Sequence, residues 1–145
     1  MLYGALEAGG TKMVLAVSDE RLNMLDRLTL PTKTPSETMP AMIDFFRERR
    51  VDALGVGTFG PVNLHADSPD YGTITATPKL AWRGYPLLRA FREALHIPCA
   101  IDTDVNAAAL GEVALGAGRG VKNCVYVTVG TGIGGGVYSE GSLVH

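Results

Sequence analysis

Near its carboxyl end the chain has a run of glycines directly after a strand-like segment, and few folds accommodate such a pair. Residues 125–129 read Val-Tyr-Val-Thr-Val, a β-branched and aromatic stretch that predicts a buried strand. Gly-Thr-Gly-Ile-Gly-Gly-Gly follows over residues 130–136. Glycine accepts positive φ and lets successive backbone N–H groups approach an anion closely. The sequence therefore predicts a phosphate-binding loop in which the Thr131 hydroxyl is a further donor.

Two other interpretations of this glycine run differ in what should follow it. Gly130, Gly132 and Gly135 also satisfy the G-x-G-x-x-G pattern of dinucleotide-binding folds, but those folds need a helix after the loop. Residues 137–144 read instead as a second strand with a turn, which favours a β-hairpin. A glycine-rich hairpin without a ligand is the alternative. A Walker-type loop is excluded because no Gly-Lys-Ser or Gly-Lys-Thr ending is present.

A similar arrangement opens the chain. Residues 2–7 and 12–18 are predicted strands, and the glycines at 9 and 10 make the tight turn between them. The order strand, glycine turn with a threonine, strand thus occurs twice, about 120 residues apart. If the two hairpins are related, each offers one phosphate-binding turn to a cleft shared by two lobes.

The segments between the hairpins predict an α/β fold. A third strand over residues 22–30 completes an antiparallel meander, and helices then alternate with parallel strands. Thr34, Pro35 and Glu37 are suited to the N-cap, N1 and N3 positions of a helix, although Pro40 would move its start toward Thr38. The remaining expectations are a solvated charge run at 47–50, a buried strand at 51–58, a long functional loop at 61–85, a helix from Pro86, a strand at 98–102 and a helix at 105–115.

Composition narrows the class of protein. A chain of 145 residues with 46% hydrophobic residues can bury a core, and its net charge of −2 gives no general attraction to nucleic acid or anionic membranes. We therefore expect neither as a partner. The absence of a membrane-length apolar run and of a signal-like start predicts a cytoplasmic protein. Cys99 and Cys124 are isolated and are expected to be buried, reduced thiols.

The segment Asp102-Thr-Asp-Val-Asn106 lies where a strand ends and a helix begins, the place where open α/β sheets bind ligands. Asp104 is the candidate general base, accepting the proton of a substrate hydroxyl during phosphoryl transfer. The alternative is that Asp104 caps the helix, and Asp102 could also do so. His65, His96 and His145 have neither ligand nor triad spacing.

Two charged residues near the first turn have possible roles at a phosphate. Glu7 could hold Mg²⁺ against the phosphates, directly or through water, and Lys12 could neutralise phosphate charge. A partly exposed strand-end acid and a solvated lysine are the alternatives.

Five motifs, in order and over nearly the whole chain, carry a family resemblance. They are Glu7-Ala-Gly-Gly-Thr-Lys12, Gly60-Pro61, Thr75-Ala-Thr-Pro-Lys79, Thr103-Asp-Val-Asn-Ala107 and Gly130-Thr-Gly-Ile-Gly-Gly135. Together they resemble the amino-terminal half of a ROK-family sugar kinase, most similar to the bacterial fructokinase branch. The resemblance implies an actin-like, ribonuclease-H-like fold in which ATP lies between two lobes. Mg²⁺ would assist transfer to a hexose hydroxyl, the 6-position in fructokinases.

The same resemblance implies roles for individual residues. Asp104 matches the catalytic base, and Glu7 stands where magnesium is supported. The residues that match the first phosphate motif are Gly9, Gly10, Thr11 and Lys12, and those that match the second are Gly130, Thr131 and Gly132. The sugar pocket would include Gly60, Pro61, Thr77, Lys79 and Thr103. Glu7 and Thr103 replace an Asp and an Asn common in glucokinase relatives, which favours fructose or mannose over glucose.

Family members continue with further motifs beyond His145: a Glu-x-x-His-type sugar motif, a Cys/His zinc cluster and most of the adenine pocket. Residues 1–118 are expected to form the first lobe, and residues 119–145 the opening strand and hairpin of a truncated second lobe with an apolar, unpaired edge. We therefore expect little or no kinase activity from these residues alone, and a homodimer of the complete protein. Rival classes are mannokinase or glucokinase specificity, a dinucleotide-dependent oxidoreductase, and a non-catalytic ROK repressor, which needs a helix-turn-helix before the first glycine motif.

Overall fold

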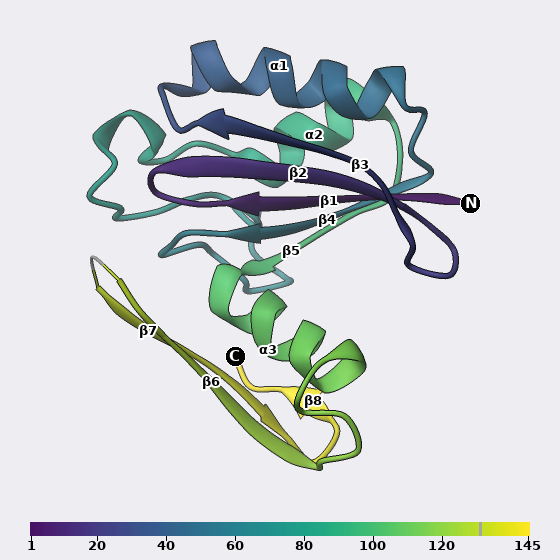
Figure 1. The fold of residues 1–145 in the computed structure, drawn as a ribbon. Coiled ribbons are helices and arrows are strands. Elements are labelled where there is room, and N and C mark those ends of the chain that lie inside the picture. Colours follow the sequence, from purple (N-terminus) through teal and green to yellow (C-terminus); the bar gives the residue numbers. More distant parts are fainter. Residues whose placement is uncertain (131) are drawn as a thin grey trace.

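The computed structural model describes residues 1–130 and 132–145, which form two sheets with a helix between them (Figure 1). The larger sheet has the strand order β3-β2-β1-β4-β5 and the smaller one β6-β7-β8. The elements are β1 Leu2–Ala8, β2 Lys12–Asp19, β3 Met24–Pro31, α1 Pro35–Glu48, β4 Ala53–Thr58, the 3-10 turn η1 Leu80–Trp82, α2 Leu87–Leu95, β5 Cys99–Thr103, α3 Asp104–Leu115, β6 Asn123–Val129, β7 Ile133–Ser139 and β8 Ser142–Leu143.

The larger sheet is mixed, as the sequence predicts. Strands β1, β2 and β3 pair antiparallel, whereas β4 pairs parallel with both β1 and β5. Because β1, β4 and β5 run in one direction, their carboxyl ends meet at the same edge of the sheet. The first glycine turn follows β1, and α3 follows β5, so both begin at that edge (Figure 1).

The core lies between one face of this sheet and helices α1 and α2. Alternate residues of the strands point into it, and the rings of Phe46 and Phe91 meet edge to face across the two helices, with centroids 6.3 Å apart. Burial of these apolar side chains is the main stabilising contribution. The completely buried side chains of the core include Met13, Leu15, Met42, Phe46, Leu54, Ile74, Trp82, Leu87, Leu88 and Phe91.

Helix α1 begins at Pro35, so the expected shift of its start toward Thr38 is wrong. Thr34 is the N-cap, and its backbone N–H and hydroxyl both donate to Glu37 Oε2, at 3.3 and 2.6 Å. This capping box stabilises the first turn. It outweighs the hydrogen bond lost at Pro40, which lies inside the helix.

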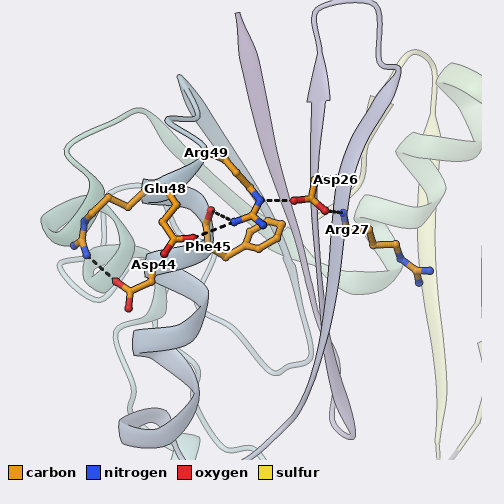
Figure 2. Close-up of polar contacts among 7 residues, drawn as sticks. Asp26, Arg27, Asp44, Phe45, Glu48 and Arg49 are labelled. Atoms are coloured by element: carbon orange, nitrogen blue, oxygen red, sulfur yellow. Dashed lines mark hydrogen bonds and ion pairs between the residues drawn. The ribbon is translucent and has the colours of Figure 1, made fainter.

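The charge run that ends α1 is only partly a solvated surface feature. Residues 47, 48 and 50 are exposed, but Arg49 is half-buried and joins the helix to β3 (Figure 2). Its Nε donates to Asp26 Oδ2 at 2.6 Å, and its guanidinium carbon lies 3.8 Å from the ring centroid of Phe45. Arg49 thus fixes the end of α1 over the sheet through an ion pair and a cation–π contact.

The smaller sheet confirms the predicted hairpin, but β6 is not a buried strand. In the β6–β7 register, Val125 faces Val137 and Val129 faces Ile133, so these apolar side chains share one face. That face has no covering element among the described residues, and Val125, Val127 and Val129 are 64%, 58% and 77% exposed. Since β6 is also an edge strand, the expected apolar, unpaired edge is present.

Two further expectations concern the cysteines and membranes. Both cysteines are free thiols, but only Cys99 is buried, and Cys124 is half-buried because it lies on the thin hairpin sheet. Over residues 1–130 and 132–145, none of the helices is long and apolar enough to cross a bilayer.

Candidate functional site

The junction between β5 and α3 places Asp104 at the first position of a helix. Thr103 is the N-cap, because its Oγ1 accepts from the backbone N–H of Asn106 at 3.2 Å. Capping by Asp104 or Asp102 is therefore wrong; a threonine hydroxyl fills that position. The half-buried Asp104 carboxylate accepts only from the adjacent N–H of Val105 within the described residues, at 2.9 Å.

Asp102 organises this junction rather than capping it. Its Oδ1 accepts from the Thr103 backbone N–H at 2.7 Å and from Nδ2 of the buried Asn106 at 2.8 Å. Its Oδ2 lies 2.7 Å from Nε2 of His145. No spacing rule links residues so far apart in the chain, and for this reason the contact of His145 was missed by sequence reasoning. These bonds fix the first turn of α3, and with it Asp104, against the end of β5.

The strand register brings Glu7 into the same region. Glu7 pairs with Gly57 across β1 and β4, and Gly57 pairs with Asp102 across β4 and β5. The three residues therefore lie in one row on one face of the sheet, with the α-carbons of Glu7 and Asp102 two strand spacings apart, about 10 Å. Gly57 leaves room for α3 between them: a β-carbon there would lie 2.8 Å from that of Ala107 and 3.5 Å from Asp104 Cα.

The first glycine turn is a closed, well-anchored loop. The Gly9 N–H donates to the Lys12 carbonyl at 2.9 Å, and the Gly9 carbonyl accepts from the Thr32 hydroxyl at 2.7 Å. The Thr11 carbonyl accepts from the Thr32 N–H at 3.0 Å. Lys12 is exposed and has no ion-pair partner within the part of the chain that the structure covers. Thr32 thus anchors the turn from the side of β3, which leaves the opposite side of the turn accessible to a ligand.

The second glycine turn joins β6 to β7 and lies beside the start of α3. The Gly130 N–H donates to the Gly132 carbonyl at 2.8 Å, whereas Thr131 lies outside the described residues. Strand β7 rests on Val105, since a β-carbon on Gly134 would lie 2.9 Å from Val105 Cγ1. In Figure 1 the two hairpin ends lie on the same side of the molecule, at the left, with the start of α3 between the two sheets. The start of α3, with Asp104, is therefore packed between β4 of the larger sheet and β7 of the second hairpin.

The segment predicted to line the sugar pocket packs beside the first turn. The Phe59 N–H donates to the Ala8 carbonyl at 2.8 Å, and the Pro61 carbonyl accepts from both the N–H and the hydroxyl of Thr75, at 2.8 and 3.1 Å. The cis Gly60-Pro61 peptide thus lies next to the end of β1.

The other predicted sugar residues are placed differently. The Thr77 side chain is completely buried and accepts from the Lys79 N–H, and the Thr103 hydroxyl is engaged in the helix cap. Lys79 lies over the first glycine turn, where its Cε is 3.6 Å from the position of a β-carbon on Gly10. The structure therefore brings Gly60, Pro61 and Lys79 to that turn, with Thr77 as a support beneath them.

The residues present fit a magnesium ion held mainly by phosphates. Among the described residues, no group of three or more His, Cys, Asp or Glu side chains could hold a metal alone. Glu7 is exposed and lies on the same row as Asp102 at the β5–α3 junction. Mg²⁺ commonly takes one or two carboxylates together with waters and substrate phosphates, which is the donor set that Glu7 and a bound nucleotide would offer.

Two surface hollows lie away from these residues. One, of about 720 Å³, is lined by α1 and η1, and the other, of about 330 Å³, lies over β1, β4 and β5 near Tyr3 and Pro98. Neither includes Asp104, Glu7 or a glycine turn.

Comparisons with known proteins now identify the family. The model described as "ROK family" matches residues 3–145. The chain belongs to the ROK family. The fructokinase of Lactococcus lactis subsp. cremoris is 48% identical over 142 residues, 98% of this chain and 48% of its own length. The fructokinase of Pediococcus pentosaceus is 46% identical over 145 residues, 100% of this chain and 50% of its own length. The chain spans about half the length of the curated relatives it matches.

A solved ROK structure agrees with the fold. The ROK family glucokinase from Streptomyces griseus, in complex with glucose and AMPPNP, superposes with a TM-score of 0.84 at 30% identity, covering 99% of this chain and 46% of that chain. The mixed α/β architecture is therefore that of ROK sugar kinases, the actin-like ATPase fold. A dinucleotide-binding fold is excluded because strand β7, not a helix, follows the second glycine turn.

Proposed function

We propose that this chain is the amino-terminal part of an ATP-dependent hexose kinase that phosphorylates the 6-hydroxyl of D-fructose. The observation that carries the proposal is the position of Asp104, on a fixed helix start that is packed between β4 and β7 and lies beside the row that holds Glu7. Phosphoryl transfer needs little covalent chemistry from the protein, and depends on a positioned base and on donors around the phosphates. These are the parts that the chain brings together.

In this proposal Asp104 accepts the proton of the sugar hydroxyl as the hydroxyl oxygen attacks the γ-phosphorus of ATP. The bond from that phosphorus to the β,γ-bridging oxygen breaks, and ADP leaves with the bonding electrons. The phosphates are held by the backbone N–H groups of Gly10 and Thr11 in the first turn and of Thr131 and Gly132 in the second, with Lys12 adding a positive charge. Gly9 and Gly130 close the two turns, since their own N–H groups donate to the carbonyls of Lys12 and Gly132. Mg²⁺, when bound with the nucleotide, neutralises phosphate charge. Glu7 is the carboxylate that would support it. Gly60, Pro61 and Thr103 border the sugar.

Fructose is favoured over glucose by two observations. The curated fructokinases quoted above are 46% to 48% identical to this chain, whereas the glucokinase of solved structure is 30% identical. Glu7 and Thr103 also depart from the glucokinase pattern. Mannose or glucose specificity, and a non-catalytic sugar-binding protein, are the alternatives that the assay must separate.

We also propose how the complete protein is divided into lobes and assembled. Residues 1–118 would be the first lobe, and residues 119–145 would open a second lobe that completes the nucleotide site. The complete protein would act in the cytoplasm as a homodimer. Sedimentation of the complete protein tests the homodimer, and a monomer would contradict it.

The decisive experiment assays the complete protein with ATP and fructose, mannose or glucose. We expect phosphorylation, fastest with fructose, and a loss of turnover of about 10²- to 10⁴-fold in Asp104→Asn with sugar binding retained. Unchanged turnover in Asp104→Asn would remove Asp104 from the base role. The 145-residue chain should have little or no activity, and family-like rates from it would contradict the two-lobe arrangement.

A further inference from the structure

Lys79 has an unexpected position for a residue of the sugar pocket. Its Cε lies 3.6 Å from the place that a β-carbon on Gly10 would occupy, so its side chain extends over the first glycine turn. The side chain is exposed and has no carboxylate partner in the part of the chain that the structure describes. A positive charge is therefore held over a turn of backbone N–H donors without a protein anion to neutralise it.

The backbone of Lys79 is fixed on a buried support. Its N–H donates to the Thr77 hydroxyl at 3.2 Å, and its carbonyl accepts from the Trp82 N–H at 2.8 Å. The Thr77 and Trp82 side chains are both completely buried. The position of Lys79 Cα thus follows from packing, even though the end of its side chain is in solvent.

That support is tied to the first glycine turn by a short chain of hydrogen bonds. The Trp82 indole N–H donates to the Lys33 carbonyl at 2.6 Å. The preceding residue, Thr32, donates its hydroxyl to the Gly9 carbonyl at 2.7 Å and its N–H to the Thr11 carbonyl at 3.0 Å. Residues 32 and 33 therefore connect the segment that bears Lys79 to the first glycine turn, which the Lys79 side chain covers.

A second link approaches the same turn from the other flank. The Trp82 ring packs edge to face against Phe59, with centroids 6.0 Å apart. The N–H of Phe59 donates to the carbonyl of Ala8, the residue before Gly9, at 2.8 Å. The position of Lys79 over the glycine turn is thus fixed through two contacts of Trp82, one with Lys33 and one with Phe59.

We infer that Lys79 belongs to the phosphate-binding part of the site, where its ammonium group pairs with the nucleotide phosphate held by residues 9–11. This deepens the proposed kinase function and rests on it. An ammonium group is a compact donor that suits a phosphate oxygen, and a second cation beside Lys12 would stabilise charge on the transferred group. A neutral sugar offers no such charge. Trp82 and Thr32 act as positioning residues through the bonds described above.

The experiment uses the complete protein and compares Lys79→Met, which keeps most of the aliphatic stem, with Lys79→Arg, which keeps the charge. Lys122→Met, which changes an exposed lysine outside the site, is the control. Calorimetry measures binding of AMPPNP, inorganic tripolyphosphate and fructose. We expect Lys79→Met to weaken both phosphate ligands at least about tenfold, since hydrogen bonds to charged groups contribute that much, and to leave fructose binding unchanged. Lys79→Arg should retain most of the phosphate affinity.

The positioning role is tested with Trp82→Phe, which keeps an aromatic ring and removes the indole N–H. It should raise the KM for ATP in the same direction as Lys79→Met by a smaller factor, with the KM for fructose unchanged.

Each outcome decides the inference. Weaker fructose binding with normal AMPPNP binding in Lys79→Met would show that Lys79 contacts the sugar and not the phosphate. Normal binding of all three ligands would show that Lys79 contacts none of them. If the unaltered protein phosphorylates no hexose but binds tripolyphosphate in a Lys79-dependent way, the kinase proposal fails while this inference stands. If it binds neither AMPPNP nor tripolyphosphate, both fail.

Discussion

Gly136 lies directly against the carbonyl oxygen of Val105, so closely that the strand has no room for a β-carbon at this point. The contact joins β7 to the first turn of α3, one residue after Asp104. The second hairpin and the proposed base are thus placed relative to each other by backbone packing, which changes little with side-chain rotamers. A change at Gly136 should therefore affect both.

We predict that Gly136→Ala destabilises the chain by about 1–3 kcal/mol, because the new methyl group overpacks the Val105 backbone. Urea unfolding of the 145-residue chain measures the effect. Gly135→Ala is the matched control, since its β-carbon would meet nothing closer than the Tyr126 carbonyl at 3.9 Å. Equal stability of the two variants would show that β7 does not rest on α3.

A second glycine tests the position of Asp104 from the sheet side. In Gly57→Ala the new methyl group would lie 2.8 Å from the Ala107 β-carbon and push the start of α3 away from β4. We expect kcat of the complete enzyme to fall about tenfold to a hundredfold, because small displacements of a catalytic group are costly. Gly55→Ala, on the same strand and face with nothing within 4 Å, should keep normal kcat. Normal kcat in Gly57→Ala would mean that the helix start is not critical.

The ion pair between Asp26 and Arg49 predicts a pH dependence of stability (Figure 2). The side-chain hydrogen bond from Arg49, followed by the backbone N–H of Arg27, holds the pKa of Asp26 below its ordinary value of 3.8. A depressed folded-state pKa gives stability that is present above the ordinary value and is lost as pH falls through the folded value. Asp26→Asn should remove this contribution.

Urea midpoints of the 145-residue chain between about pH 2.5 and pH 7 check the prediction. The difference between the unaltered chain and Asp26→Asn should be constant near neutrality and shrink in acid. Asp67→Asn changes a loop carboxylate that makes no hydrogen bond in the described part of the chain, and it is the control. A difference that persists undiminished below the folded pKa would contradict the ion-pair explanation.

The exposed valine face of the β6–β7 hairpin predicts self-association of the 145-residue chain. Contiguous apolar surface on an edge hairpin favours pairing with another copy. Val125→Lys and Val127→Lys should each increase the monomer fraction in sedimentation velocity, whereas Leu22→Lys, in the exposed turn between β2 and β3, should not. A chain that is monomeric at every concentration would contradict this prediction.

Features governed by neighbouring residues were well predicted from the sequence. The two glycine hairpins, the meander and the Thr34 capping box depend on residues close together in the chain, and all are present. The strand-to-helix junction was also predicted, but Asp104 and Asp102 were the capping residues considered there and Thr103 was not, although all three are good capping residues. Only the hydrogen bond from Asn106 to Thr103 distinguishes them.

Features governed by distant residues were not predicted. The place of Lys79 over the first glycine turn is one such feature, since nothing local to residues 75–79 indicates that Trp82 is bonded to Lys33 beside that turn. The contact of His145 with Asp102 was not predicted for the same reason, since the two residues are far apart in the chain. Strand β6 was expected to be buried because its residues are apolar, but burial depends on which elements cover a face, and none of those described does so.

Trp82 is the only tryptophan of the 145 residues, and its indole N–H donates to the Lys33 carbonyl. The preceding residue, Thr32, donates its hydroxyl to the Gly9 carbonyl. Emission excited selectively at the indole therefore comes from one location, a few bonds from the proposed phosphate contact. In the 145-residue chain this indole is therefore a natural fluorophore beside the proposed phosphate contact, and binding of a phosphate ligand there can be followed by its emission without an attached dye.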